Sequence, residues 1–208
     1  MSGYFLPLIW FLLIIKVCSY EPLLDFLNIQ ENHREIAFGL STECENSLIK
    51  ISEGIQQNEI WAIKIRDASG NSQPGFVWGN KFWLGSETAC EALNHPKKFP
   101  LTPSKSRLTL PHVIEIATEV PVEYRMFYAS HTSTIQFDSD LFEFDGLHLG
   151  LCFPKACKKQ EINRMAQVVF QSGEFTNTAI YGNVTFTKTK TLKVRANFFD
   201  EIFVQILM

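Results

Sequence analysis

Five cysteines lie along this chain of 208 residues, and their positions constrain the possible folds more than any other feature. Cys18 closely follows an unbroken apolar run from Phe5 to Ile15, whereas the others lie at positions 44, 90, 152 and 157. A membrane-spanning helix needs roughly 20 apolar residues, so this shorter N-terminal run is typical of the core of a signal peptide. The first cysteine therefore belongs to a segment that we expect to be removed.

Residues 1–19 form the expected signal peptide. Val17 and Ser19 suit the −3 and −1 positions of a cleavage site after Ser19. An uncleaved anchor helix is the alternative, and Lys16, which ends the apolar run early, argues against it. The mature chain is then expected to be secreted, or to lie on the extracellular or luminal face of a membrane.

The remaining cysteines are even in number, which in a secreted chain indicates two disulfides. Zinc binding is the competing interpretation, but the spacing contains no Cys-x-x-Cys pair and no histidine at ligand spacing. An even set also leaves no free thiol for a cysteine nucleophile. We therefore expect no metal and no cofactor.

Four cysteines permit three pairings. A Cys152–Cys157 bridge would close a loop of about six residues, and such a short loop constrains the unfolded chain least. Pro154 also fixes φ inside that loop. The predicted pairs are therefore Cys44–Cys157 and Cys90–Cys152. The first pair would join the starts of two predicted helices, with a benefit of about 4–5 kcal/mol in the chain-entropy description.

Composition excludes two classes of protein. The chain is 46% apolar with 18 phenylalanines, which is ample material for a core and argues against general disorder. Its formal net charge of -3 argues against nucleic acid as a partner, because such proteins carry a concentrated basic surface.

Hydrophobic spacing predicts an α+β domain with two amphipathic helices and a short antiparallel sheet. One helix begins at Cys44, from which apolar residues recur at i+4, i+7 and i+11, and Ser41 or Thr42 can cap it. The second helix covers residues 158–171. Segments rich in β-branched and aromatic residues predict strands within 113–120, 124–128 and 179–196.

Three other segments are less regular. Residues 20–42 are polar with scattered leucines and phenylalanines, and we expect a loose N-terminal arm there. Residues 60–65 fit either a strand or a continued helix. Residues 70–85 alternate glycines with aromatic residues, which predicts a structured loop.

The segment from Cys44 to Val168 resembles the N-terminal domain of the nose-resistant-to-fluoxetine family. The matching pieces stand in family order: Cys44 before an amphipathic helix, Trp61-Ala62, Asp67-Ala68-Ser69-Gly70, Pro74-Gly75, Gly79-Asn80, Gly85, Cys90 and Cys152-Phe153-Pro154-Lys155-Ala156-Cys157. The resemblance covers over half of the chain and places a family-type domain at residues 43–196.

This resemblance implies a non-catalytic extracellular or luminal domain that supports the handling or transport of lipids or lipophilic xenobiotics. Its expected partners are a lipid or lipophilic small molecule and a membrane acyltransferase-like domain. The alternative is a regulatory N-terminal fragment of a multi-pass membrane acyltransferase. Residues 197–208 are apolar and too short to span a membrane, and would form a stub before such a region.

The chain departs from the family pattern at two positions. Related chains often have Tyr-Cys where this one has Tyr124-Arg125, and a further cysteine near residues 190–200, where this one has none. If those two cysteines normally pair, their joint absence agrees with two disulfides.

Four aromatic residues are candidates for a ligand-binding cleft: Trp61, Phe76, Trp78 and Trp83. Apolar pockets hold lipophilic ligands, although the same residues could form the core of the domain. Asn183 begins an Asn-Val-Thr glycosylation sequon in a polar, strand-like stretch.

Two catalytic interpretations are weak. Asp67-Ala68-Ser69-Gly70 lacks the second carboxylate that an aspartic protease needs, and is better explained by a turn in which Gly70 takes a positive φ. His131 lies beside Ser130, Thr132 and Ser133, which offers a base and a nucleophile for a hydrolase by composition only.

The compartment can be tested by expression in a secretory host. We expect a protein that begins at Tyr20 and is heavier by one glycan at Asn183, as measured by intact mass and N-terminal sequencing. An intact Met1 terminus with an unmodified Asn183 would contradict both the signal peptide and the oxidising compartment.

Overall fold

The computed structural model describes residues 22–27, 39–70, 75–95, 116–136, 146–171 and 182–191. The expected signal peptide and the apolar segment 197–208 lie outside these residues. The described elements, in chain order, are α2 (Pro22–Leu27), α4 (Thr42–Gln56), α5 (Ile60–Ala68), β1 (Phe82–Trp83), α6 (Glu87–Asn94), β2 (Val122–His131), β3 (Gly146–Pro154), α8 (Lys159–Gln171) and β4 (Val184–Thr191).

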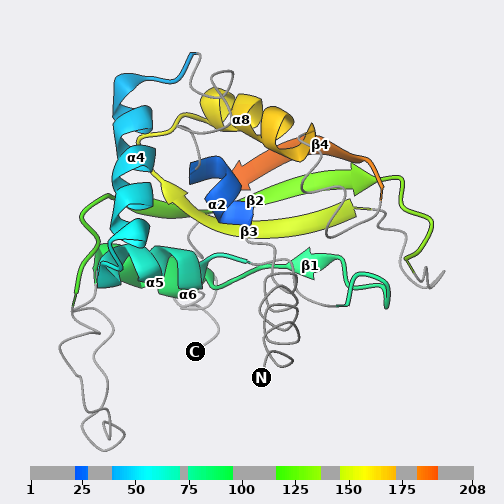
Figure 1. The fold of residues 1–208 in the computed structure, drawn as a ribbon, viewed down its shortest axis with the longest axis horizontal. Coiled ribbons are helices and arrows are strands. Elements are labelled where there is room, and N and C mark those ends of the chain that lie inside the picture. Colours follow the sequence, from blue (N-terminus) through cyan, green and yellow to red (C-terminus); the bar gives the residue numbers. More distant parts are fainter. Residues whose placement is uncertain are drawn as a thin grey trace, which may run out of the picture.

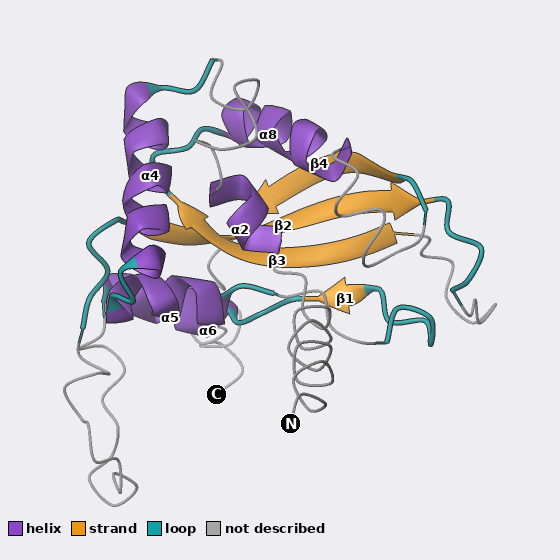
Figure 2. Ribbon diagram, viewed as in Figure 1, coloured by secondary structure: helices purple, strands orange, loops and turns teal. Residues whose placement is uncertain are grey.

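A four-stranded sheet organises the domain, with strand order β1-β3-β2-β4 (Figure 1). β2 is antiparallel to both β3 and β4, whereas the two-residue β1 runs parallel to β3. The α+β class is confirmed, with the correction that the sheet is mixed, because β1 pairs with β3 in parallel. Figure 2 shows the helices arranged around this sheet.

One face of the sheet holds the aromatic core. Phe26 of α2 packs against Phe127 of β2, Phe153 of β3 and Phe170 of α8, with ring centroids 5.2, 5.6 and 6.3 Å away. Aromatic side chains bury large areas and favour tilted or edge-on contacts of this kind. These contacts hold α2 and α8 on the same face.

The structure differs from the expected loose arm at residues 20–42. Pro22–Leu27 form helix α2, and Leu23, Phe26 and Leu27 are at most 4% exposed. Their i, i+3 and i+4 spacing gives even this short helix one apolar face, and burial of that face stabilises it where propensity alone would not.

Both disulfides join elements far apart in the chain. Cys44 in α4 is bonded to Cys157, just before α8, and Cys90 in α6 is bonded to Cys152 in β3. These are the same pairs as those expected from loop length. Their separations of 113 and 62 residues mean that each bond removes much freedom from the unfolded chain.

The start of α4 is linked to the start of α8 by hydrogen bonds as well. Ser41 caps α4 by accepting from the backbone N–H of Cys44 at 3.4 Å. The Glu161 carboxylate accepts from the backbone N–H of Ser41 at 2.5 Å and from that of Lys158 at 2.6 Å. One carboxylate therefore serves the N-terminal regions of two helices beside the Cys44–Cys157 bond.

The structure assigns two further segments: one for which the sequence left helix and strand open, and one for which it predicted a strand. Residues 60–65 lie in helix α5, whose buried face includes Trp61, Ala62 and Ile65. Residues 116–120 form a loop and not part of a strand, because the backbone N–H of Thr118 donates to the carbonyl oxygen of Leu93 at 3.0 Å. The strand expected over 113–120 is therefore wrong for its described part.

Three backbone segments meet where only glycine fits, at a place we call the glycine junction: Gly70, Gly85 and Gly150. The N–H of Gly70 donates to the carbonyl oxygen of Gly150 at 2.7 Å. A Cβ at Gly70 would overlap the carbonyl oxygen of Trp83, and one at Gly150 would overlap the carbonyl oxygen of Leu84. Gly85 has a φ of +61°.

The junction also explains the Asp67–Gly70 motif. The Ser69 hydroxyl donates to the carbonyl oxygen of Ile65 at 2.9 Å and accepts from the N–H of Cys152 at 3.0 Å. It thereby connects the end of α5 to β3. Gly70 is not among the glycines with positive φ, so the turn expected there is wrong; the site needs glycine because another backbone lies too close for a side chain.

Substitution of Gly150 by alanine should test this close approach. The added methyl group has backbone on one side and the buried Tyr124 hydroxyl on the other, so we expect a loss of about 2–3 kcal/mol in the free energy of unfolding. Gly146→Ala on the same strand is the matched control, since its nearest neighbour would lie at 3.6 Å. Urea titrations of both variants measure the difference, and equal midpoints would contradict the junction.

Glu161→Gln should change how stability depends on pH. Partial burial by itself would raise the pKa of Glu161, but hydrogen bonds from the backbone of Lys158 and Ser41 outweigh it and lower that pKa. The carboxylate therefore stabilises the fold above its unfolded pKa, and this contribution is lost as pH falls through the lowered folded pKa. We expect the variant to be about 1 kcal/mol less stable at neutral pH.

The same difference should shrink in acid, where the native carboxyl is protonated and resembles the amide. Glu53→Gln, on an exposed position of α4, is the control and should change little at any pH. Denaturant titrations at neutral and acidic pH provide the measurement. A difference that does not depend on pH would show that the charge of Glu161 has no role.

Candidate binding site

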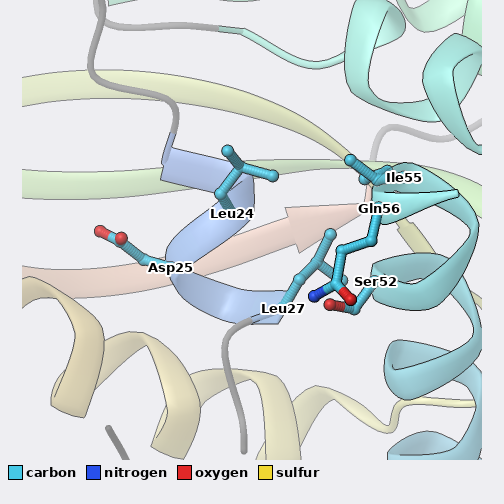
Figure 3. A pocket seen from close by; sticks show the side chains of 6 residues that line it. All are labelled: Leu24, Asp25, Leu27, Ser52, Ile55 and Gln56. Atoms are coloured by element: carbon cyan, nitrogen blue, oxygen red, sulfur yellow. The ribbon is translucent and has the colours of Figure 1, made fainter. Parts of the chain in front are cut away.

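A groove between α2 and α4 is the candidate binding site, with a volume of about 260 Å³. Figure 3 shows Leu24 and Leu27 of α2 facing the side chains of α4 across it. Its lining residues are Leu24, Asp25, Leu27, Ser52, Ile55 and Gln56.

The groove exists because α2 packs along α4 with only part of its apolar face. Leu23 and Phe26 lie in the core at 1% and 0% exposure, whereas Leu24 is 36% exposed. Leu24, Leu27 and Ile55 supply apolar walls, and Ser52 and Gln56 supply a hydroxyl and an amide on the same side. Such a site can hold an apolar chain and hydrogen-bond a polar end.

The aromatic residues proposed from the sequence do not line this groove. Trp61, Phe76 and Trp83 are buried in the core at 5%, 4% and 3% exposure, whereas Trp78 is 86% exposed. Phe76 packs on Trp83 with ring centroids 6.4 Å apart. Three of the four therefore build the fold, and the fourth lies on the surface.

Sequence reasoning missed the groove because it treated residues 20–42 as an arm. The i, i+3, i+4 spacing of Leu23, Phe26 and Leu27 was the available signal, although it spans little more than one turn. Nothing in the sequence indicated that this turn would pack beside Ser52 and Ile55.

His131 contacts Ser133 and Phe76 through its imidazole ring. The bond that joins it to Ser133 is donated by the Ser133 backbone N–H to the imidazole Nδ1 at 3.3 Å, so the hydroxyl is not the partner there. Phe76 packs edge-on against the same ring, with centroids 5.1 Å apart. These contacts favour a packing role for the imidazole.

A buried tyrosine connects the sheet to the glycine junction. Burial, together with Glu87 and Tyr128, raises the pKa of Tyr124 to about 12. Its hydroxyl therefore stays protonated and donates to the carbonyl oxygen of Leu84. The hydroxyl group thus supplies a hydrogen-bond donor to a carbonyl group in a tightly packed region, which is a structural role.

Arg125 of β2 is a buried cation with two polar partners. It is 8% exposed, forms an ion pair with Glu123 and donates to the carbonyl oxygen of Cys157 at 3.4 Å. Its strand partner on β4 is Thr191. The Arg125 side chain thus links β2 to the segment just before α8, beside the Cys44–Cys157 disulfide.

The described residues contain no group of three or more histidine, cysteine or acidic side chains placed to hold a metal. Among the same residues, no helix is long and apolar enough to cross a membrane.

Asn183 lies at the start of β4 in an exposed position. Its backbone N–H donates to the Thr132 hydroxyl at 3.1 Å, and its carbonyl oxygen accepts from the Thr132 N–H at 3.0 Å. Both bonds use the backbone of Asn183 and leave its side chain out. Glycosylation at Asn183 stays a prediction, and the exposed side chain is sterically compatible with it.

Fold and groove together define a disulfide-linked α+β domain with an apolar surface site. Residues 44–166 match the model of the nose resistant-to-fluoxetine protein, N-terminal domain, and the chain belongs to this family. No curated protein and no solved structure matched the chain.

Proposed function

We propose that this domain binds a lipid or lipophilic small molecule in the α2–α4 groove, without chemistry of its own, and so supports lipid or xenobiotic handling on the extracellular or luminal side of a membrane. The observation that carries the proposal is the groove, with apolar walls, two neutral polar groups of α4 on one side and the Asp25 carboxylate on the α2 side. Membership of the nose resistant-to-fluoxetine family supports it, since fluoxetine, the drug in the family's description, is lipophilic.

The size of the groove narrows the ligand class. Drug-sized ligands occupy pockets of roughly 300–1,000 Å³, and the volume here is about 260 Å³. A slender ligand such as a single acyl chain fits better than a branched, multi-ring compound. Ser52 and Gln56 would then hydrogen-bond a carboxyl or ester group at one end of the chain.

A fluorescent fatty acid, 11-(dansylamino)undecanoic acid, tests the groove directly. We expect saturable binding that Leu24→Glu weakens by roughly 10–100-fold, because a charge replaces one leucine contact. Ile60→Glu is the matched control: Ile60 is 39% exposed, close to the 36% of Leu24, and lies outside the groove. Equal affinities in the two variants, or no saturable binding, would overturn the proposal.

A regulatory role beside a membrane acyltransferase is the second candidate. The family description identifies the matched segment as an N-terminal domain, which favours a protein with further parts. Sequencing the transcript beyond the codon for Met208 tests it. Several apolar spans downstream would support this role, and a stop codon there would contradict it.

A further inference from the structure

A row of four side chains crosses the sheet on the face opposite the aromatic core. Phe82 of β1 is paired with His148 of β3, His148 with Tyr128 of β2, and Tyr128 with Lys188 of β4. The ring centroids of Phe82 and His148 lie 4.8 Å apart, as do those of His148 and Tyr128. Directly paired residues project from the same face of a sheet, so the four form one continuous strip.

Two lysines end this strip at the β4 edge. The Nζ atoms of Lys188 and Lys190 lie 5.5 and 5.6 Å from the centre of the Tyr128 ring, and both residues are exposed. Cation–π contacts at this distance hold the ammonium groups over the ring while leaving them open to solvent. Positive charge is therefore held in place on this face.

Exposed apolar side chains gather at the opposite, β1 end. Trp78 is 86% exposed and Phe82 52%, and both belong to the segment that leads into and forms β1. The Gln136 side chain donates to the carbonyl oxygen of Asn80 at 3.3 Å, which brings the neighbourhood of Ile135 to the same edge. Most of the large exposed apolar residues that the structure describes lie here: Val77, Trp78, Phe82, Leu84 and Ile135.

No strand contributes an acidic side chain to the face that carries this strip. β1, β3 and β4 contain neither Asp nor Glu, and the one acid of β2, Glu123, alternates onto the other face and is paired with Arg125. The strands therefore contribute lysines and no acid to this face, although the whole chain has a formal net charge of -3. Glu87 of α6 lies near Tyr124, toward the α6 end of the face and away from Lys188 and Lys190 on β4. The segregation of charge matters because local potential, not net charge, attracts a charged surface.

We propose that this face, from Trp78 and Phe82 to Lys188 and Lys190, docks on the surface of a phospholipid bilayer that contains anionic headgroups. Exposed tryptophan and lysine together on one surface are typical of membrane interfaces, where the indole lies at headgroup depth and the ammonium groups meet phosphates. Protein–protein interfaces, in contrast, are depleted in lysine. The site is separate from the groove and does not depend on the proposed ligand.

Vesicle co-sedimentation with the secreted chain, beginning at Tyr20, tests the docking. We expect binding to vesicles of phosphatidylcholine mixed with phosphatidylserine, weaker binding to phosphatidylcholine alone, and loss of the difference at high salt. Lys188→Gln with Lys190→Gln should weaken binding to the mixed vesicles by about tenfold or more. Lys155→Gln with Lys159→Gln, which removes the same charge at exposed positions at the end of β3 and the start of α8, should have little effect.

Quenching of tryptophan fluorescence by brominated phosphatidylcholine in the mixed vesicles locates the contact. The chain that begins at Tyr20 lacks Trp10, and Trp61 and Trp83 are buried, so quenching should come from Trp78. It should largely vanish in Trp78→Phe, which keeps an apolar side chain. Leu24→Glu should leave vesicle binding unchanged, which separates this proposal from the groove. Trp78→Ser should weaken binding, whereas Ile60→Ser should not.

Three outcomes would overturn the proposal: no vesicle binding, equal loss in the two lysine double variants, or unchanged quenching in Trp78→Phe. A dimer that forms without vesicles and is abolished by Trp78→Ser would assign this face to a second copy of the chain instead. Thermal unfolding of each variant shows that the fold is intact, as expected for substitutions at exposed positions.

Discussion

The close packing of three backbone segments at the glycine junction is the constraint on which the rest of the structure depends. The N–H of Gly70 donates to the carbonyl oxygen of Gly150, while Gly85 lies in the left-handed region beside them. This contact sets the distance between the end of α5, the centre of β3 and the segment after β1. A side chain at any of these positions would force the segments apart, and no repacking of a core could absorb that shift.

The two disulfides hold the elements that the junction cannot reach. Cys90–Cys152 fixes α6 on β3, and Cys44–Cys157 fixes α4 beside the start of α8. The short helix α2 has no such bond and depends on Phe26, whose ring meets the aromatic residues of three other elements. The candidate groove is formed at this helix, which no disulfide ties to its neighbours.

Residues that follow local rules could be predicted from the sequence, and residues that depend on distant neighbours could not. Helical spacing after Cys44 and before Gln171 predicted α4 and α8 because one face of each helix must be buried. Prediction of the groove would have required the position of α2 relative to Ser52 and Ile55, and no local sequence pattern contains that information. Gly70 was expected to be glycine because of a positive φ. Glycine is instead required there because the carbonyl oxygen of Trp83, in a later segment of the chain, leaves no room for a Cβ.

Because one disulfide is nested inside the other, a proteolytic cut of the backbone need not separate the chain into free fragments. The Cys90–Cys152 bond lies inside the loop that Cys44–Cys157 closes. Any cut of the backbone between Cys90 and Cys152 therefore produces two pieces that both bonds still connect. A nicked molecule of this kind keeps its halves at a high effective concentration and separates only after reduction, so cleavage in that stretch would change the number of chains without releasing either one.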